Sequence, residues 1–263
     1  HLLLATDRER ARALYEGVLK YDEPKAWCGL AYIHREDDQA KASEYLQKLR
    51  KLPNSKRPIE FFLDFVALAD KKTANEAGVF LADRGYEWIR QKILKQSFGS
   101  SYAPLSNMIE YGQALSGNAN MRWHVLQLFE DRVFLLSENI LGTMSYVDGA
   151  TNADWSSSAI RQWLNEEFVR MAFESTDEGT ARILRINEDL VTCLTPEEYE
   201  SLANGATGYR NAFLRTKKTW WLKATGNDTM NAPYVRGSKV NWGFARVKDG
   251  IRPALWLKLE SGE

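Results

Sequence analysis

Hydrophobic residues in the first third of the chain recur at spacings of three and four, as they do on one face of an α-helix. The positions that share this spacing in the first two segments are Ala11, Leu14, Tyr15, Val18, Trp27, Leu30, Ala31 and His34. Polar breaks at residues 22–24, 53–55 and 70–72 separate the segments, and Pro24 and Pro58 suit the first turn of a helix. The pattern predicts short amphipathic helices from residue 5 to about residue 96.

The period changes after a stretch of linker-like composition at residues 99–106. Residues 122–129 partly alternate between apolar and polar, residues 130–131 make a turn, and residues 132–137 form a second apolar run. This pattern predicts a β-hairpin. Short aromatic runs separated by Gly, Asn and Pro predict that strands return from about Trp220 to the end of the chain.

Two further helices are predicted between these groups of strands. Ser156 or Ser157 can cap a helix with an apolar stripe, and Thr195 stands at capping-box spacing from Glu198. The stripe of the first helix consists of Ile160, Trp163, Leu164 and Phe168, and its other faces carry Arg161, Gln162, Asn165 and Glu166. We therefore predict an α+β chain with a helical domain at residues 1–98, a linker at 99–106 and a mixed domain at 107–263.

The helical segment from Leu14 to Leu52 resembles a tetratricopeptide-type hairpin, in which small residues lie where two helices cross. Helical bundles of other origins share this feature, so a plain bundle stays open as an alternative. Stacked hairpins leave a concave groove that can bind a peptide or another domain. The alternative is a spacer that only packs against the second domain.

Charge and composition narrow the function classes. The chain has 263 residues, with 35 basic and 35 acidic side chains, so no long-range field attracts nucleic acid or an anionic membrane. No apolar run approaches the roughly 20 residues that a membrane span needs. Because the chain opens on His1 rather than Met, an upstream signal or anchor stays open. The compartment is left unassigned, either cytoplasmic or an excised part of an envelope-associated protein.

Several long motifs recur in a recognisable order in the second domain. In chain order, these motifs are Ile109-Glu110-Tyr111-Gly112, Arg122-Trp123-His124-Val125-Leu126, Val133-Phe134-Leu135-Leu136-Ser137, Trp155-x-x-Ser158-x-Ile160-Arg161-x-Trp163-Leu164-Asn165, Trp220-Trp221-Leu222-Lys223 and Gly250-Ile251-Arg252-Pro253-Ala254-Leu255-Trp256-Leu257. This series resembles a bacterial domain of unknown function that is common in gut Firmicutes, over roughly residues 107–259. One departure is visible at residues 223–225, where Lys-Ala-Thr replaces the more usual Arg-Ser-Pro.

That family is similar in turn to the formylglycine-generating-enzyme branch of the C-type-lectin fold. The resemblance implies a compact, irregular lectin-like domain with short strands and long loops. The enzymes of that branch bind copper through two cysteines, whereas only Cys193 lies in the second domain and Cys28 lies in the first. Related iron enzymes need clustered histidines, and the three here are His1, His34 and His124. We predict no catalytic residues, no metal site and no cofactor.

Other catalytic, metal-binding or nucleic-acid-binding sites have little support in the sequence. His124 could join a Ser/His/Asp triad, but its predicted strand position beside a tryptophan favours a structural role. Asn227, Asp228 and Asp249 offer too few oxygens for calcium. The paired carboxylates at 166–167 and 197–198 are interpreted as solvated helix faces, and the lysines at 217–218 as a solvated turn rather than a site for single-stranded nucleic acid.

Aromatic and basic side chains of the last third are the remaining candidates for binding. Packing is assigned to Trp123, Trp155, Trp163, Trp256 and at least one of the adjacent Trp220 and Trp221, and Arg252 is expected to bond buried carbonyls. The residues predicted to bind a protein or glycan ligand are Tyr209, Tyr234, Arg236, Asn241, Trp242 and Arg246. The alternatives are an enzyme of unknown mechanism that uses His124, Asp228 or Asp249, and a structural module of a larger envelope-associated protein.

Overall fold

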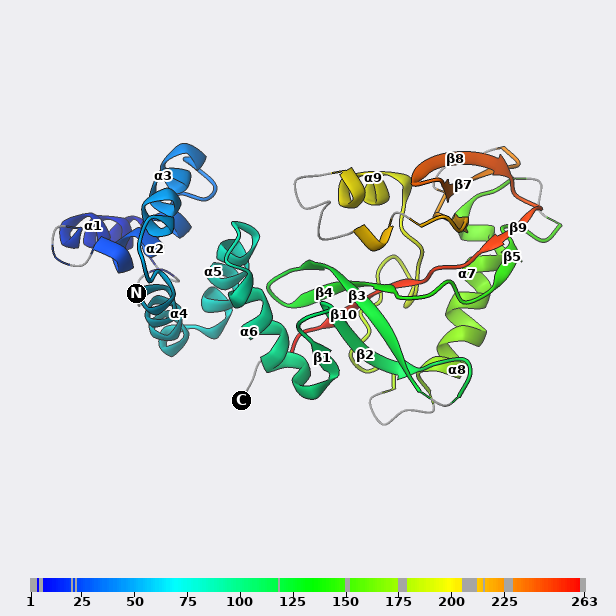
Figure 1. Ribbon diagram of the computed structural model, residues 1–263, viewed down its shortest axis with the longest axis horizontal. Coiled ribbons are helices and arrows are strands. Elements are labelled where there is room, and N and C mark those ends of the chain that lie inside the picture. The colour runs from blue at the N-terminus through cyan, green and yellow to red at the C-terminus, as the bar shows by residue number, and fades with distance from the viewer. Residues whose placement is uncertain are drawn as a thin grey trace. The chain divides into compact units, whose positions relative to one another are not determined.

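The computed structural model describes residues 4, 7–19, 21, 23–117, 119–149, 152–174, 179–204, 212–214, 216–224 and 229–260. The chain divides into two compact units. The first unit comprises residues 1–97, 129–131 and 260–263, and the second comprises 98–128 and 132–259. Helices come first and sheets follow, so the fold is mixed α+β, as the sequence pattern predicts (Figure 1).

Short capped helices build the first unit. They are α1 (Arg8–Val18), α2 (Glu23–Ile33), α3 (Gln39–Arg50), α4 (Lys56–Ala69), α5 (Lys71–Asp83) and α6 (Glu87–Phe98). The carboxylates of Asp7, Asp38 and Asp70 accept hydrogen bonds from backbone N–H groups of the turns that follow them. Because Asp70 ends α4 and also caps α5, the predicted break is confirmed at this residue, although residues 71–72 already belong to α5. Pro24 and Pro58 lie in the first turns of α2 and α4, as predicted.

Helix α2 lies at the centre of this unit, since it packs on α1, α3 and α4. Its Leu30 and Ile33 side chains are fully buried, and so is Leu49 of α3. Gly29 allows a close approach between α1 and α2, because a Cβ at this position would lie 2.4 Å from the ring of Tyr15. Most of the apolar positions predicted from the spacing of three and four therefore form one shared core. Leu14 and Val18 are exposed, so their assignment to the buried face of the first helix was wrong.

The second unit contains two five-stranded sheets. The first sheet has the order β1-β2-β3-β4-β10, and every pair in it is antiparallel. Its strands are β1 (Tyr102–Ala103), β2 (Met108–Gln113), β3 (Asn120–Leu128), β4 (Arg132–Ser137) and β10 (Ala254–Lys258). The pairing of β3 with β4 confirms the predicted hairpin. Residues 99–106, predicted as a linker, contain a 3₁₀ turn (Gly99–Ser101) and strand β1, whose Tyr102 is buried.

The second sheet has the order β5-β9-β6-β7-β8. Its strands are β5 (Thr143–Ser145), β6 (Trp220–Trp221), β7 (Asn231–Arg236), β8 (Lys239–Phe244) and β9 (Lys248–Gly250). Strands β6 and β9 run parallel, and the other neighbours run antiparallel. Gly237 and Ser238 connect β7 to β8 with φ angles of 58° and 64°, as in a type I′ turn.

One buried cluster joins the two sheets and helix α9 (Pro196–Asn204). Trp220 packs edge-on against Tyr199 of α9, while Trp221 packs edge-on against Tyr146 and Tyr234. Both tryptophans are fully buried, because β6 is covered on its two faces. The sequence predicted this burial for at least one of them. Trp123 and Trp155 are buried as predicted, and the partly buried Trp163 and Trp256 pack against Phe168 and Phe134, so the packing role predicted for these four is confirmed.

A helical rod follows the 3₁₀ turn η3 (Trp155–Ser157). It consists of α7 (Ala159–Trp163), the π-helical turn η4 (Leu164–Phe168) and α8 (Val169–Ala172). The hydroxyl of Ser158 accepts the N–H of Arg161 at 3.0 Å, so Ser158 is the cap and the prediction of Ser156 or Ser157 was wrong. Those two serines belong to η3, which Asp154 caps. A further 3₁₀ turn, η5, spans Ala212–Leu214.

The predicted capping box of α9 is confirmed by two reciprocal hydrogen bonds. The Thr195 N–H donates to Glu198 Oε2 at 2.8 Å, and the Glu198 N–H donates to Thr195 Oγ1 at 3.2 Å. Glu198 is half-buried, so its interpretation as part of a solvated face was wrong. None of the helices that the structure describes combines the length and the apolar character needed to cross a bilayer.

Candidate functional site

The predicted ligand-binding residues divide over two faces of the β7–β8 hairpin. Tyr234 is paired with Asn241, and Pro233 is paired with Trp242. Because side chains alternate along a strand, Tyr234, Arg236 and Asn241 share one face and Trp242 lies on the other. Arg246 is exposed in the turn after β8. Tyr209 lies outside the described residues.

On the first face, Asn241 and Tyr234 have distinct roles. The Asn241 side-chain amide donates to the carbonyls of Arg236 at 3.3 Å and Lys239 at 2.9 Å. These bonds close the hairpin turn and occupy the amide group. Tyr234 is half-buried, and a Cβ at Gly243 would lie 2.8 Å from its ring. Its aromatic ring therefore lies close over Gly243 of the neighbouring strand β8.

The second face carries two exposed aromatic side chains. Trp242 is 56% exposed and Phe244 is 51% exposed, although both belong to a regular strand. Strand β8 is the last strand of its sheet, so its outer edge has no neighbouring strand within the described sheet. Large aromatic side chains at such an edge are available to a partner.

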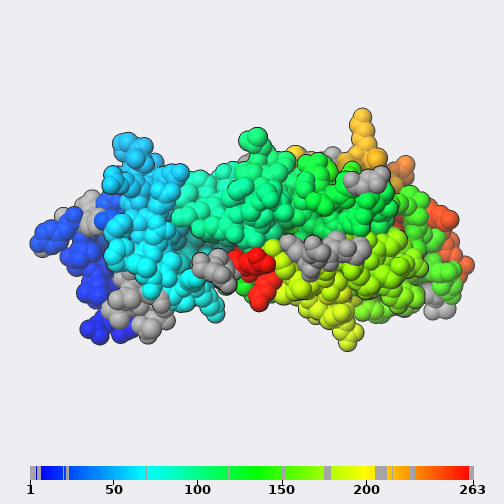
Figure 2. Space-filling model, turned by 90° about the horizontal axis from the view of Figure 1, so that it is seen from below, coloured from blue at the N-terminus to red at the C-terminus, as the bar shows by residue number. Residues whose placement is uncertain are grey.

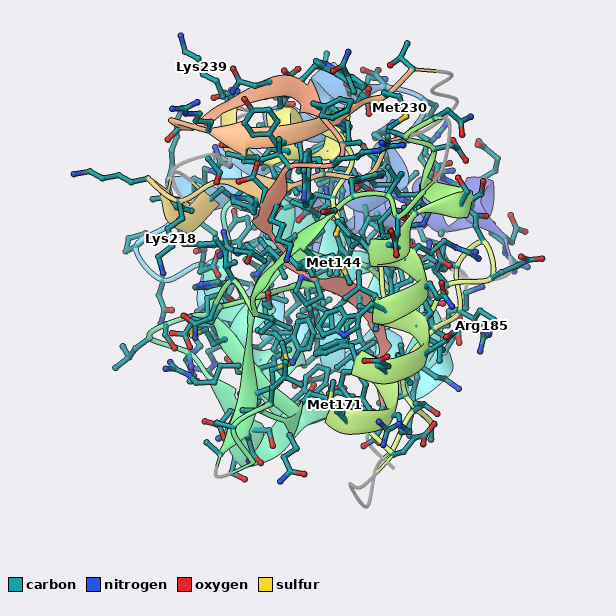
Figure 3. All side chains as sticks on the ribbon, turned by 90° about the vertical axis from the view of Figure 1, so that its right-hand side faces the viewer. Met144, Met171, Arg185, Lys218, Met230 and Lys239 are labelled. Atoms are coloured by element: carbon teal, nitrogen blue, oxygen red, sulfur yellow. The ribbon has the colours of Figure 1, made fainter. Side chains whose placement is uncertain are left out.

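An open groove of about 840 Å³ lies on the same side of the sheet as Tyr234 and Arg236. The residues that line the groove come from the segment 140–143, from the end of β7, from the segment 217–219 before β6, and from 247–250 around β9. Its basic members are Lys217, Lys218, Arg236 and Lys248, and its acidic member is Asp249, whose carboxylate accepts a hydrogen bond from Thr219. Figure 3 views the second unit from this end, with Lys218 toward the left edge of the molecule and Met144 near the centre of the view.

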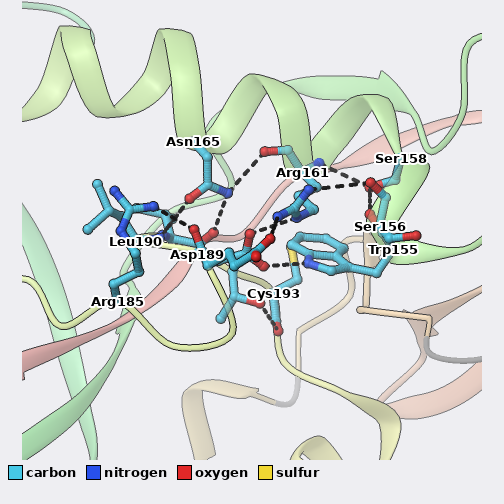
Figure 4. Close-up of polar contacts among 12 residues, drawn as sticks. Trp155, Ser156, Ser158, Arg161, Asn165, Arg185, Asp189, Leu190 and Cys193 are labelled. Atoms are coloured by element: carbon cyan, nitrogen blue, oxygen red, sulfur yellow. Dashed lines mark hydrogen bonds and ion pairs between the residues drawn. The ribbon is translucent and has the colours of Figure 1, made fainter.

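A partly buried polar cluster, which we call the clamp, lies beside the helical rod (Figure 4). The clamp consists of Trp155, Arg161, Asn165 and Asp189. The carboxylate of Asp189 accepts the indole N–H of Trp155 at 2.7 Å and the guanidinium Nε–H of Arg161 at 2.7 Å. Asn165 Oδ1 accepts the N–H groups of residues 190 and 191 at 2.7 and 3.1 Å, and its Nδ2 donates to the residue 191 carbonyl at 2.9 Å.

The clamp gives a structural role to the longest sequence motif, which runs from Trp155 to Asn165. Arg161 and Asn165 were placed on the polar faces of their helix, but both hold the segment that contains Asp189. Asp189 was not found from the sequence, because nothing in the sequence marks its pairing with residues that lie far away along the chain. The spacing of four between Arg161 and Asn165, which puts both on one side of a helix, was the available signal.

His124 has a structural environment rather than a catalytic one. Its imidazole is buried and stacks on Phe213 with ring centroids 3.7 Å apart. Burial, together with the positive charges of Arg252 and Arg122, lowers its pKa to about 4. The ring is therefore neutral at pH 7. Among the described residues, no carboxylate forms an ion pair with it, and it does not line the groove that contains Asp249.

The shifted pKa of His124 predicts a pH-dependent stability. The unfolded imidazole has a pKa near 6.5 and the folded one about 4, so between these values the unfolded state binds more protons. Stability should fall as the pH drops from 6.5 to 4, by up to about 1.4 kcal/mol per pH unit from this residue. Urea unfolding at several pH values should show a smaller slope for His124→Gln. An equal slope in the wild type and the variant would contradict the assignment.

The other candidate chemical groups are also accounted for by packing. Cys193 is buried, and burial raises its thiol pKa to about 12, which leaves no thiolate at neutral pH. Arg252 donates to the carbonyls of Ser137 at 3.0 Å, Phe213 at 3.3 Å and Glu138 at 3.3 Å, as predicted. No group of three His, Cys, Asp or Glu side chains among the described residues could hold a metal ion. Asp228 lies outside those residues.

Comparison with known proteins finds a family match in the second unit. Residues 130–214 match the family model described as "Domain of unknown function (DUF6273)". No curated protein and no solved structure matches the chain. The matched segment runs from β4 to η5 and includes every member of the clamp. Part of this segment forms the yellow-green surface in Figure 2. A domain of unknown function agrees with the motif resemblance, and no activity is attached to it.

Proposed function

We propose that this chain is a bacterial ligand-recognition protein without catalytic activity, which binds a protein or a glycan through its second unit. The second unit is lectin-like in this proposal, of the formylglycine-generating-enzyme type, and the first unit is a tetratricopeptide-like support. Short strands, long connections and a C-terminal strand held by Arg252 support the lectin-like assignment. The packing of α2 on α1 and α3 supports the helical one.

The observation on which the proposal rests is the exposure of Trp242 and Phe244 on strand β8. The second unit buries Trp123, Trp220 and Trp221 almost completely, so it has a core in which large aromatic rings pack. An indole that stays more than half exposed beside such a core leaves apolar surface in water. A partner that covers this surface gains contact area from a side chain with few rotatable bonds.

The alternative enzyme has less support. His124 stacks on Phe213, Asp249 is bonded to Thr219, and the two side chains do not line a common groove. A general base must reach its substrate within hydrogen-bond distance, and a ring packed face-to-face against phenylalanine leaves little room for one.

Substitution of Trp242 tests the proposed function. We expect Trp242→Ala to weaken binding by about tenfold or more, since loss of a central aromatic contact costs at least ~1.4 kcal/mol. The measurement is a glycan array together with pull-downs in which each captured protein is purified and bound again at known concentration.

The matched control is Leu105→Ala, because Leu105 is also an exposed apolar side chain of the second unit. Arg236→Ala is included as a variant of the other hairpin face. Equal binding by the wild type, Trp242→Ala and Arg236→Ala would remove the hairpin as the binding site. Absence of any glycan or protein ligand for the wild type would contradict the recognition function itself.

A further inference from the structure

The groove beside Tyr234 concentrates positive charge, although the chain as a whole has a net charge of zero. The sequence contains 35 basic and 35 acidic residues, yet the groove is lined by Lys217, Lys218, Arg236 and Lys248 against the single carboxylate of Asp249. Three separate segments of the chain contribute these bases, and they meet because β9, β6 and β7 are neighbours in the sheet. The charge is therefore a local property of the fold.

The single acid that lines the groove neutralises only part of this charge. The Asp249 carboxylate, which accepts a hydrogen bond from Thr219, offsets one of the four positive charges, and none of the four basic side chains forms an ion pair with another described residue. All four are exposed, so each can reach a ligand without first breaking a contact. Like charges held close together repel each other, and an anion placed among them relieves that repulsion.

The groove offers side chains rather than free main chain. Along the segments that line it, the N–H of Gly250 donates to the Thr219 carbonyl at 3.3 Å, and the N–H of the following residue, Ile251, donates to the Gly142 carbonyl at 3.0 Å. The Leu141 N–H donates in return to the Ile251 carbonyl at 2.9 Å. An extended peptide that adds to a sheet needs unpaired strand groups, and these three N–H groups are already paired.

The remaining contact groups suit a sugar. The Tyr234 ring provides a flat aromatic surface, supported from behind by Gly243 of β8. The hydroxyl-bearing side chains of Thr143 and Thr219 line the same groove. Aromatic faces pack against the apolar faces of sugar rings, and hydroxyls exchange hydrogen bonds with sugar hydroxyls.

We propose that this groove binds an anionic glycan, with Arg236, Lys218 and their basic neighbours pairing with its carboxylate or sulfate groups and Tyr234 lying against a sugar ring. This inference rests on the proposed recognition function, names the ligand class, and adds a contact site on the Tyr234 face of the hairpin, opposite Trp242. Arg236 supplies the planar donor pair that fits a carboxylate or a sulfate. The lysines act as point charges that attract the polymer over a longer range.

The test uses four purified polymers: heparin for sulfate groups, polygalacturonate for carboxylate groups, dextran as the neutral glycan and polyglutamate as the acidic peptide. Binding to the full chain is measured by titration calorimetry at two salt concentrations. The groove variant is Lys218→Gln/Arg236→Gln. Its matched control is Lys51→Gln/Arg57→Gln, which removes the same charge from exposed positions of the first unit. Thermal unfolding confirms that both variants fold.

We expect heparin or polygalacturonate to bind the wild type and the control, and the groove variant to bind about tenfold or more weakly. The preferred polymer identifies sulfate or carboxylate as the recognised group. The proposal is overturned if neither anionic glycan binds, if the control loses as much affinity as the groove variant, or if polyglutamate alone binds through the groove. Loss of ligand by Trp242→Ala with full binding by the groove variant would reject the groove and leave the recognition function standing.

Discussion

Replacement of Asp189 by alanine is expected to lower the free energy of unfolding of the second unit by about 3–5 kcal/mol. The Asp189 side chain is only 3% exposed and accepts both the Arg161 guanidinium and the Trp155 indole N–H. Its removal leaves a half-buried positive charge and a buried donor without their acceptor. It also releases the segment whose N–H groups Asn165 binds.

The measurement is urea unfolding followed by tryptophan fluorescence, with the midpoint and the slope both reported. Glu188→Gln is the matched control, because Glu188 is the neighbouring acid but its side chain is 90% exposed. The control should change stability by less than about 0.5 kcal/mol. Asp189→Asn, which keeps one acceptor and loses the charge, should fall between the two. A variant Asp189→Ala as stable as Glu188→Gln would show that the clamp does not hold the unit together.

Gly112→Ala is expected to destabilise the second unit by about 2–4 kcal/mol, through backbone strain and overpacking together. Gly112 has a φ angle of 74°, in the region that favours glycine. A Cβ there would lie 2.5 Å from the ring of Phe173 and 2.8 Å from the carbonyl oxygen of Ala172. Strand β2 and helix α8 can therefore pack only if this position has no side chain.

A second glycine separates the two causes. Gly117 has a nearly equal φ of 79°, but a Cβ there would meet no atom within 4 Å. Gly117→Ala should therefore show the backbone strain alone, about 1 kcal/mol. Thermal unfolding of the two variants should differ by the overpacking contribution. Equal losses would mean that the Phe173 ring moves aside without cost.

Local rules predicted much of the architecture. Asp70 ends one helix and begins the next because its carboxylate accepts backbone N–H groups, and Thr195 with Glu198 forms a capping box, so both boundaries were visible in the sequence. The cap at Ser158 was missed because three consecutive serines offer the same hydroxyl. Only the turn that Asp154 caps decides which of them begins the helix.

The candidate site was predicted less well, since its geometry depends on which strands become neighbours. Tyr234 and Trp242 were expected on one surface. Because side chains alternate along the strands of a hairpin with a two-residue turn, the two residues lie on opposite faces. That alternation could have been applied from the sequence once the turn at Gly237 and Ser238 was recognised. Lys217 and Lys218 were interpreted as a solvated turn, and their position near Arg236 follows from a strand order that no local pattern encodes.

The pairing of β10 with β4 also affects the order in which the chain can fold. Helix α2 contacts helices that are close to it in sequence, so the first unit can form early during synthesis. Strand β4 must instead wait until Lys258 has been made before its partner strand can pair with Arg132 and complete the sheet. Until then the apolar side chains of β4 lack one neighbour. A nascent chain paused before β10 would therefore expose an unpaired, aggregation-prone strand edge that chaperones can bind.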